Sequence, residues 1–299
     1  MKTFAFFVLV GLLFIFSLNA NADELDLLVD TNTTSKIRGE LYASLCKKDF
    51  SKMAYKLAKL KTTHSVISSI GPQTKKPWNE EQLSLGDRIG CTLSLLWRYH
   101  VIRVKQKSYA ECIELMMSIF GNTKAKDRER QIALREIASN LHFGVSPYGR
   151  TLSTTEVNKT ISRLDKYVFD ESESIELRKS ILPILFEHGD PNKYLNLAIE
   201  ITNIETNPLV KVQLFWNVTP PYNTDKYTPE NRNKYLKYAF DLLKQVDDGK
   251  TGKGYFLATH IGRFVGVKNK FKPDKNPSEC DSFFQKTVDN ALKWWAANK

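Results

Sequence analysis

The sequence has few of the residues that mark a disulfide-rich, collagenous or low-complexity protein. It contains four cysteines, 14 glycines and 11 prolines in 299 residues. Four cysteines are too few for a disulfide-dense scaffold. Hydrophobic residues make up 42% of the chain and charged residues 26%, which excludes collagen, low-complexity disorder and a polytopic membrane protein. The chain is therefore expected to fold around an apolar core.

Sequence signatures of the common catalytic sites are also absent. The sequence contains no HExxH, GxSxG, P-loop or GxGxxG motif, so zinc-protease, nucleophile-elbow and phosphate-cradle chemistries have no support. It has no CxxC, and its five histidines are scattered, so neither residue type lies at metal-ligand spacing. We predict no catalytic residue, no metal site and no cofactor.

Long apolar runs are missing except at the N-terminus. There, a basic start at Lys2 precedes the mainly apolar run Phe4–Leu18, and small residues three apart end at Ala22. This order is typical of a secretory signal peptide, and the run is shorter than the roughly 20 residues that span a bilayer. We predict cleavage after Ala22 and an exported mature chain without a transmembrane segment, periplasmic if the source is Gram-negative and otherwise secreted. Three N-x-[ST] sequons matter only in a eukaryotic source, and they begin at Asn32, Asn158 and Asn217.

Apolar residues recur with the 3.6-residue period of a helix, and the alternation typical of strands is nearly absent. After Thr228, for example, the apolar positions 235, 236, 239, 240, 243 and 246 form one stripe opposite a polar face. The pattern predicts an all-α fold. The expected helices lie near residues 35–47, 50–70, 80–105, 108–120, 127–142, 153–168, 171–188, 191–204, 208–215, 229–247, 253–266 and 277–297.

Helix start and stop signals agree with these helices. Three expected helices begin with a capping side chain followed by proline, whose missing N–H costs no helical bond; the pairs are Asp190-Pro191, Thr228-Pro229 and Asn276-Pro277. Capping boxes are predicted at Ser108–Glu111 and Ser153–Glu156. Left-handed glycines are predicted to end helices at Gly71, Gly121 and Gly189.

Loops rich in Gly, Pro and Asn divide the mature chain. The loop 142–150 is the expected boundary between an N-terminal helical region, residues 35–142, and a C-terminal helical region, residues 151–299; one continuous domain is the alternative. Residues 1–22 form the predicted signal peptide. Residues 23–34 are predicted to be a flexible acidic arm, which carries Asp23, Glu24, Asp26 and Asp30.

The segment Leu177–Pro191, continuing into Tyr194–Ala198, resembles a HEAT-type repeat. In that family, two antiparallel helices meet at a short turn similar to Gly189-Asp190-Pro191, and Ala291–Trp295 is similar to the last helix of some such arrays. No strict period recurs along the chain, as it would in a regular array. The resemblance implies antiparallel helical hairpins stacked into an irregular array that binds partners on one face. It implies no catalytic residue.

All four cysteines lie in the mature chain, where export permits disulfides. An up-down stack places the end of helix 35–47 level with the start of helix 108–120, which favours a Cys46–Cys112 bridge. A hairpin of helices 80–105 and 108–120 would hold Cys91 about 15 Å from Cys112, beyond disulfide reach. Buried thiols without any bridge are the alternative.

Positive charge gathers near the C-terminus of a chain whose formal charge is +11. Between residues 249 and 278 only Asp274 opposes a set of basic residues, and Tyr255, Phe264 and Phe271 lie among them. The predicted binding patch consists of Lys250, Lys253, Arg263, Lys268, Lys270, Lys272 and Lys275. Such a patch suits an acidic protein or an anionic envelope component, whereas export argues against nucleic acid. A solvated loop that aids solubility is the alternative.

These observations favour an exported, non-catalytic helical protein that binds an acidic partner, for example an inhibitor or immunity-type protein. The alternative is a cell-envelope hydrolase that acts on peptidoglycan, because a single buried glutamate that serves as general acid leaves no sequence signature.

Overall fold

The computed structural model describes residues 23–64, 76–79, 83–103, 108–145, 152–220, 224–246, 252–266, 270–273 and 280–298. Every regular element within these ranges is helical, and no strand occurs in them. The predicted all-α fold class is thus confirmed. The chain divides into two compact units between Thr151 and Leu152, just after the stretch 142–150 in which the boundary was expected.

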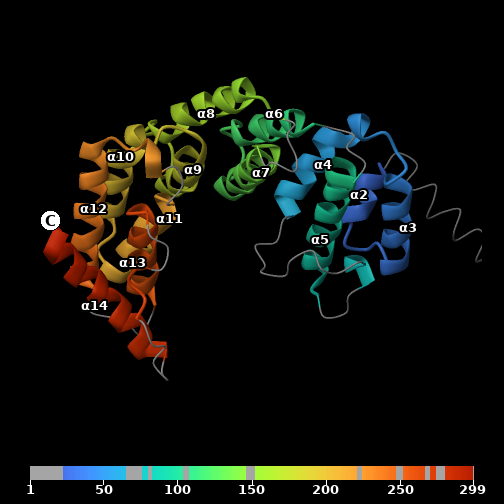
Figure 1. Cartoon of the computed structure of the whole chain (residues 1–299). Helices are drawn as coiled ribbons and strands as arrows, with labels where there is room; N and C mark the ends of the chain where they lie inside the picture. The colour runs from blue at the N-terminus through green and yellow to red at the C-terminus, as the bar shows by residue number, and fades with distance from the viewer. Residues whose placement is uncertain are drawn as a thin grey trace, which may run out of the picture. The chain divides into compact units, whose positions relative to one another are not determined.

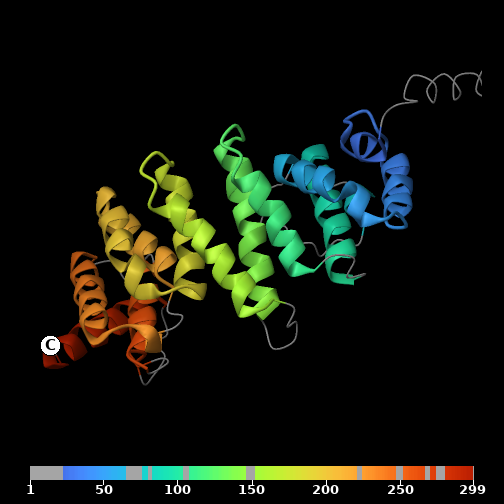
Figure 2. The same cartoon turned by 90° about the horizontal axis from the view of Figure 1, so that it is seen from above.

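The first unit is built from helices that pack mainly on their neighbours in the chain (Figure 1). Helix α4 contacts α5, α6 and α7, and α6 lies against α7 (Figure 2). The elements are α2 (Glu24–Val29), α3 (Ser35–Leu45), α4 (Phe50–His64), the 3-10 turn η1 (Pro77–Asn79), α5 (Leu85–Arg98), the π-helical turn η2 (Tyr99–Arg103), α6 (Tyr109–Phe120) and α7 (Asp127–Val145).

Helix α2 corrects the prediction that residues 23–34 form a flexible arm. Leu25 and Leu28 are fully buried, because their spacing of three puts both on one face of a short helix. Asp23 caps this helix by accepting a hydrogen bond from the Leu25 N–H at 3.0 Å. The acidic residues that suggested a solvated arm instead face lysines of α4 and of the turn before it, in the pairs Lys48–Glu24, Lys56–Asp26 and Lys56–Asp23.

Two helix boundaries differ from the predicted ones. The helix expected over 50–70 is described as far as His64, and residues 65–70 lie outside the described ranges. The helix expected over 80–105 begins after Ser84, whose side chain accepts from the Asp87 N–H, and its α-helical part ends at Arg98. The chain then widens into η2, a type of turn that appears in short pieces next to α-helices.

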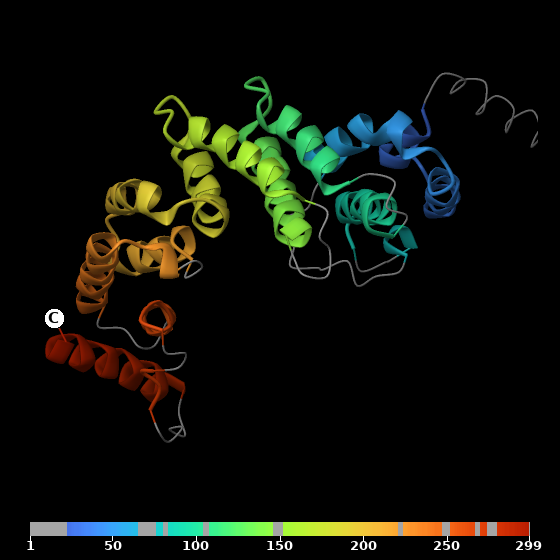
Figure 3. The same cartoon turned by 45° about the horizontal axis from the view of Figure 1, so that its top comes forward.

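The second unit is a succession of helices in which each packs on the next (Figure 1). Contacts also join α9 with α11, α11 with α13, α10 with α12 and α12 with α14. Figure 3 shows α14 as the long red helix that crosses α13, which is seen nearly end-on. The elements are α8 (Thr154–Val168), α9 (Ile175–His188), α10 (Pro191–Ile204), α11 (Pro208–Val218), the 3-10 turn η3 (Thr224–Lys226), α12 (Pro229–Gln245), α13 (Lys253–Phe264) and α14 (Cys280–Asn298).

Most predicted capping residues act as caps. Both capping boxes form, and Asp190 and Thr228 each accept a backbone N–H of the helix that they precede. Asn276-Pro277 and Gly71 lie outside the described residues. The predicted left-handed conformation is wrong for Gly121 and Gly189, whose φ angles are −74° and −102°. Gly189 is needed for space instead, because a Cβ there would lie 2.7 Å from the carbonyl oxygen of Leu185.

In three pairs of successive helices, a hydrogen bond of the same type joins residues that are ten positions apart in the chain. In each, the fourth residue of a helix is an arginine whose Nε donates to a carbonyl in the last turn of the preceding helix. Carbonyls at a helix end have no partner within the helix, so the guanidinium both satisfies one and joins the pair. The bonds are Arg38 to Leu28 at 2.9 Å, Arg130 to Phe120 at 2.8 Å and Arg178 to Val168 at 2.9 Å.

Candidate functional site

The short segment 270–273 of the predicted basic patch is held against α14. Phe271 is 3% exposed, and its ring centroid lies 5.7 Å from that of Trp294. The Asn290 Nδ2 donates a hydrogen bond to the Phe271 carbonyl at 3.1 Å. An apolar anchor and a backbone hydrogen bond thus fix this stretch, so it differs from the solvated loop that was the alternative.

Two lysines flank the anchor. Lys270 and Lys272 are exposed on either side of the buried Phe271. The Lys270 ammonium lies over the Trp294 ring, 4.5 Å from its centroid. A cation placed in this way at an exposed site gains about 0.5–1 kcal/mol. The ring therefore orients Lys270 and leaves its ammonium accessible.

Helix α14 adds two more lysines on the same side. Lys286 and Lys293 are exposed and seven positions apart, which places them on one helix face together with Asn290 and Trp294. The opposite face carries the buried Val288 and Ala291, and Trp295 stacks on Phe240 of α12 with centroids 4.6 Å apart. Packing on α12 and α13 therefore turns the lysine face outward.

We call Lys270, Lys272, Lys286 and Lys293 the basic surface. Within the part of the chain that the structure describes, none of the four ammonium groups forms an ion pair with a carboxylate. On α14 itself, Asp289 lies three positions after Lys286 and four before Lys293, on the same face, and its carboxylate accepts a hydrogen bond from the Gln285 side chain at 2.9 Å. The two lysines of α14 thus flank one carboxylate, and neither of them forms an ion pair with it.

The other described residues of the predicted patch lie far from one another. Lys253 begins α13 and Arg263 lies ten residues later on the same helix, so a rise of about 15 Å separates them along its axis. Lys250, Lys268 and Lys275 lie outside the described residues. Lys286 and Lys293 were missed because charge was counted along the sequence between residues 249 and 278, whereas the surface continues around α14.

The cysteines do not form the predicted bridge. The structure holds Cys46, Cys91 and Cys112 as thiols, so Cys46 and Cys112 are not joined. Burial raises the pKa of the Cys46 thiol and, with the nearby Asp87, that of Cys91. A raised pKa lowers the thiolate fraction that disulfide exchange needs. The side chain of Cys280 lies outside the described residues.

His260 of α13 is a buried histidine that packs against α11 in the second unit. Its ring lies 5.8 Å from that of Trp216 on α11 and is 7% exposed. Burial and the charge of Arg263 lower its pKa to about 3. The ring therefore stays neutral at ordinary pH and has the environment of a packed core residue rather than that of a proton shuttle.

The described ranges hold no group of three or more His, Cys, Asp or Glu that could bind a metal ion. None of their helices is long and apolar enough to cross a membrane. A comparison with protein-family models, curated proteins and solved structures finds no match. The function is therefore inferred from the residues of this chain.

Proposed function

We propose that the chain is an exported, non-catalytic interaction protein whose basic surface binds an acidic protein. The observation that carries the proposal is the set of four accessible lysines around Trp294 that have no carboxylate partner among the described residues. A partner that supplies aspartate and glutamate side chains would neutralise this charge and would be attracted from a distance. An inhibitor or immunity-type protein that blocks an enzyme is its concrete form.

The order of the basic surface supports recognition of a defined partner. Phe271 is buried against Trp294, and the Lys270 ammonium lies over the same ring. Side chains that are already positioned lose less conformational entropy on binding than free ones. The proposed partner therefore meets a surface in which Phe271 and Lys270 are already positioned.

We also infer that the second unit is a stacked array of helical hairpins similar to HEAT repeats. The contacts between alternate helices, α9 with α11, α11 with α13, α10 with α12 and α12 with α14, support this arrangement. Arrays of this kind offer continuous faces for partners. Export rests on the N-terminal sequence, and N-terminal sequencing of protein from the envelope fraction should begin at Asp23.

The binding proposal is tested by charge reversal with a matched control. The test variant carries Lys286→Glu and Lys293→Glu on α14, and the control carries Lys166→Glu and Lys237→Glu on α8 and α12, where both lysines are also exposed. Wild-type protein on a resin should retain an acidic protein from envelope extract at low salt and release it at high salt. The test variant should retain at least tenfold less of it, and the control should match the wild type.

Three results would contradict the proposal. They are capture of no acidic protein at low salt, equal losses in the test and control variants, and retention that does not depend on salt. A zymogram on peptidoglycan distinguishes the alternative activity. Clearing by the purified chain would show hydrolysis, which a pure binding protein lacks.

A further inference from the structure

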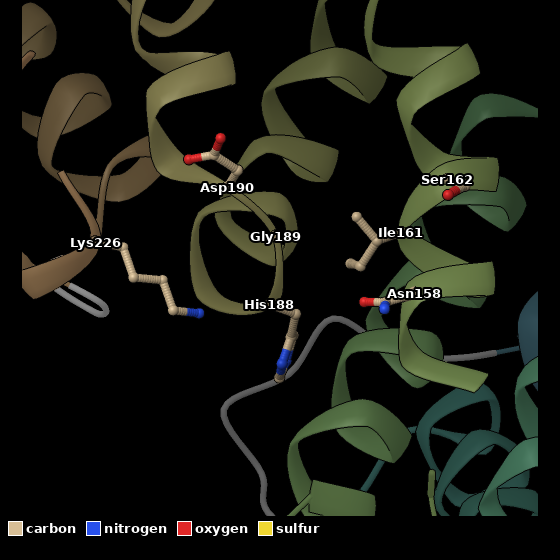
Figure 4. A pocket seen from close by; sticks show the side chains of 7 residues that line it. All are labelled: Asn158, Ile161, Ser162, His188, Gly189, Asp190 and Lys226. Carbon is tan, nitrogen blue, oxygen red and sulfur yellow. The ribbon is translucent and has the colours of Figure 1, made fainter. Parts of the chain in front are cut away.

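The second unit contains a cavity of about 550 Å³, and none of the residues that line it belongs to the basic surface. It lies between one face of α8, the turn that joins α9 to α10, and η3 (Figure 4). Its volume is within the usual range of small-molecule sites. The lining residues are Asn158, Ile161, Ser162, His188, Gly189, Asp190 and Lys226.

One wall of the cavity is bare backbone by necessity. A Cβ at position 189 would lie 2.7 Å from the Leu185 carbonyl and 3.0 Å from the Tyr194 ring. Tyr194 is itself held, because its hydroxyl donates to Asp165 of α8 at 2.6 Å. A side chain at position 189 would thus clash with the end of α9 and with Tyr194, so this wall of the cavity is formed by glycine backbone.

The position of Lys226 is fixed by Asn192 in the first turn of α10. The Asn192 Nδ2 donates to the Lys226 carbonyl at 2.9 Å, and the Asn192 Oδ1 accepts from the Thr228 N–H at 2.9 Å and from Asn231 Nδ2 at 3.1 Å. These bonds tie η3 and the start of α12 to α10. The base of the Lys226 side chain is therefore anchored beside the cavity.

The lining presents more available donors than acceptors. No hydrogen bond or ion pair within the described residues involves the side chains of Asn158, Ser162 or Lys226. Figure 4 shows Lys226 and Asn158 on opposite sides of His188, with the Asp190 carboxylate turned away from His188. That carboxylate already accepts from the Asn192 backbone and side chain, at 3.0 and 2.8 Å.

We propose that this cavity binds a small hydroxylated carboxylate, such as a sugar acid. The Lys226 ammonium would pair with the carboxylate, since a charge-assisted hydrogen bond of this kind is stronger than a neutral one. Asn158 and Ser162 offer both donors and acceptors to hydroxyl groups. Ile161, which is 7% exposed, supplies an apolar contact for the carbon skeleton. The proposal does not depend on the basic surface or on an acidic protein partner.

The test is equilibrium binding to the mature chain, measured by calorimetry and by ligand-observed NMR. The probes are glucuronate, glucose, which has the same ring without the carboxylate, and glucosamine, which carries a positive charge. Glucuronate should bind saturably and at least tenfold more tightly than glucose or glucosamine. Lys226→Met should weaken glucuronate binding about tenfold, and Ser162→Ala should weaken it less.

Matched variants separate this proposal from the binding of an acidic protein. Lys272→Met removes an exposed lysine of the basic surface and should leave glucuronate binding unchanged, whereas Lys226→Met should leave capture of the acidic protein unchanged. Lys226 is exposed, so its variant is expected to fold, which circular dichroism would check. Absence of saturable glucuronate binding at millimolar concentration, equal binding of glucose, or wild-type affinity in Lys226→Met would each overturn the proposal.

Discussion

Helices α2 and α14 lie near the two ends of the described chain, and both bury one face; α2 carries carboxylates and α14 carries two exposed lysines. The carboxylates of α2 face Lys48 and Lys56 of the same unit. The lysines on the outer face of α14 have no such partner among the described residues. The comparison shows that a cluster of charge has a different meaning when the fold supplies the opposite charge than when it does not.

The apolar residues of the two helices explain why both are integrated in the fold. Leu25 and Leu28 bury one face of α2, and Val288 and Ala291 bury one face of α14. The charged face is then positioned by the packing of the other face. Only the surroundings of that charged face decide between internal pairing and an open binding surface.

The strongest test of this comparison is removal of an apolar contact from α2. Leu28→Ala should lower the free energy of unfolding by about 2–5 kcal/mol, because it leaves a cavity at a fully buried site. Urea unfolding followed by circular dichroism measures the change. Ile37→Ala, at a 47% exposed position of α3, is the control and should cost much less. Equally small losses of unfolding free energy in the two variants would indicate that residues 23–34 are a flexible arm.

The second unit should lose stability in acid because of the buried His260. Its folded pKa is near 3 and that of an unfolded histidine is about 6.5, so the unfolded chain binds an extra proton between these values. Stability should therefore fall as the pH drops below about 6.5, by roughly 1.4 kcal/mol per pH unit. Denaturant unfolding between pH 7 and 4 should show this slope in the wild type and a flatter one in His260→Phe. Parallel slopes would contradict the assignment.

The smallest expected effect is the difference in stability loss between substituting a lysine that pairs with α2 and substituting one on the basic surface. Lys56→Met removes the partner of Asp23 and Asp26 and should cost about 0.5 kcal/mol, since these groups are largely exposed and screened by solvent. Lys272→Met, on the basic surface, should change stability even less. The difference should shrink at high salt. Replicate chemical denaturation at two salt concentrations resolves it, and a larger loss in Lys272→Met would reverse the comparison.

Local signals in the sequence predicted the helices well because each depends on residues that are close together. The capping boxes at Ser108 and Ser153 and the caps at Asp190 and Thr228 all involve neighbours within three positions. Helix α2 was missed because six residues give too short a window for periodicity, and its acidic composition resembles that of a solvated tail.

The candidate sites were harder to predict because their residues come from separate segments. Counting charge in one window grouped Lys253 with Arg263, which lie toward opposite ends of α13. The same window stopped before Lys286 and Lys293, although a spacing of seven was a usable signal. The cavity had no signal of this kind, because Ser162, His188 and Lys226 meet only through the packing of three elements.

The arginines that reach back ten residues have a consequence for how the chain acquires its structure. Each closes a small loop between successive helices without help from distant segments. Closing a short loop loses less chain entropy than bringing remote segments together, and local contacts speed folding. Each of the three hairpins can therefore gain order early during synthesis, as soon as its own two helices have left the ribosome.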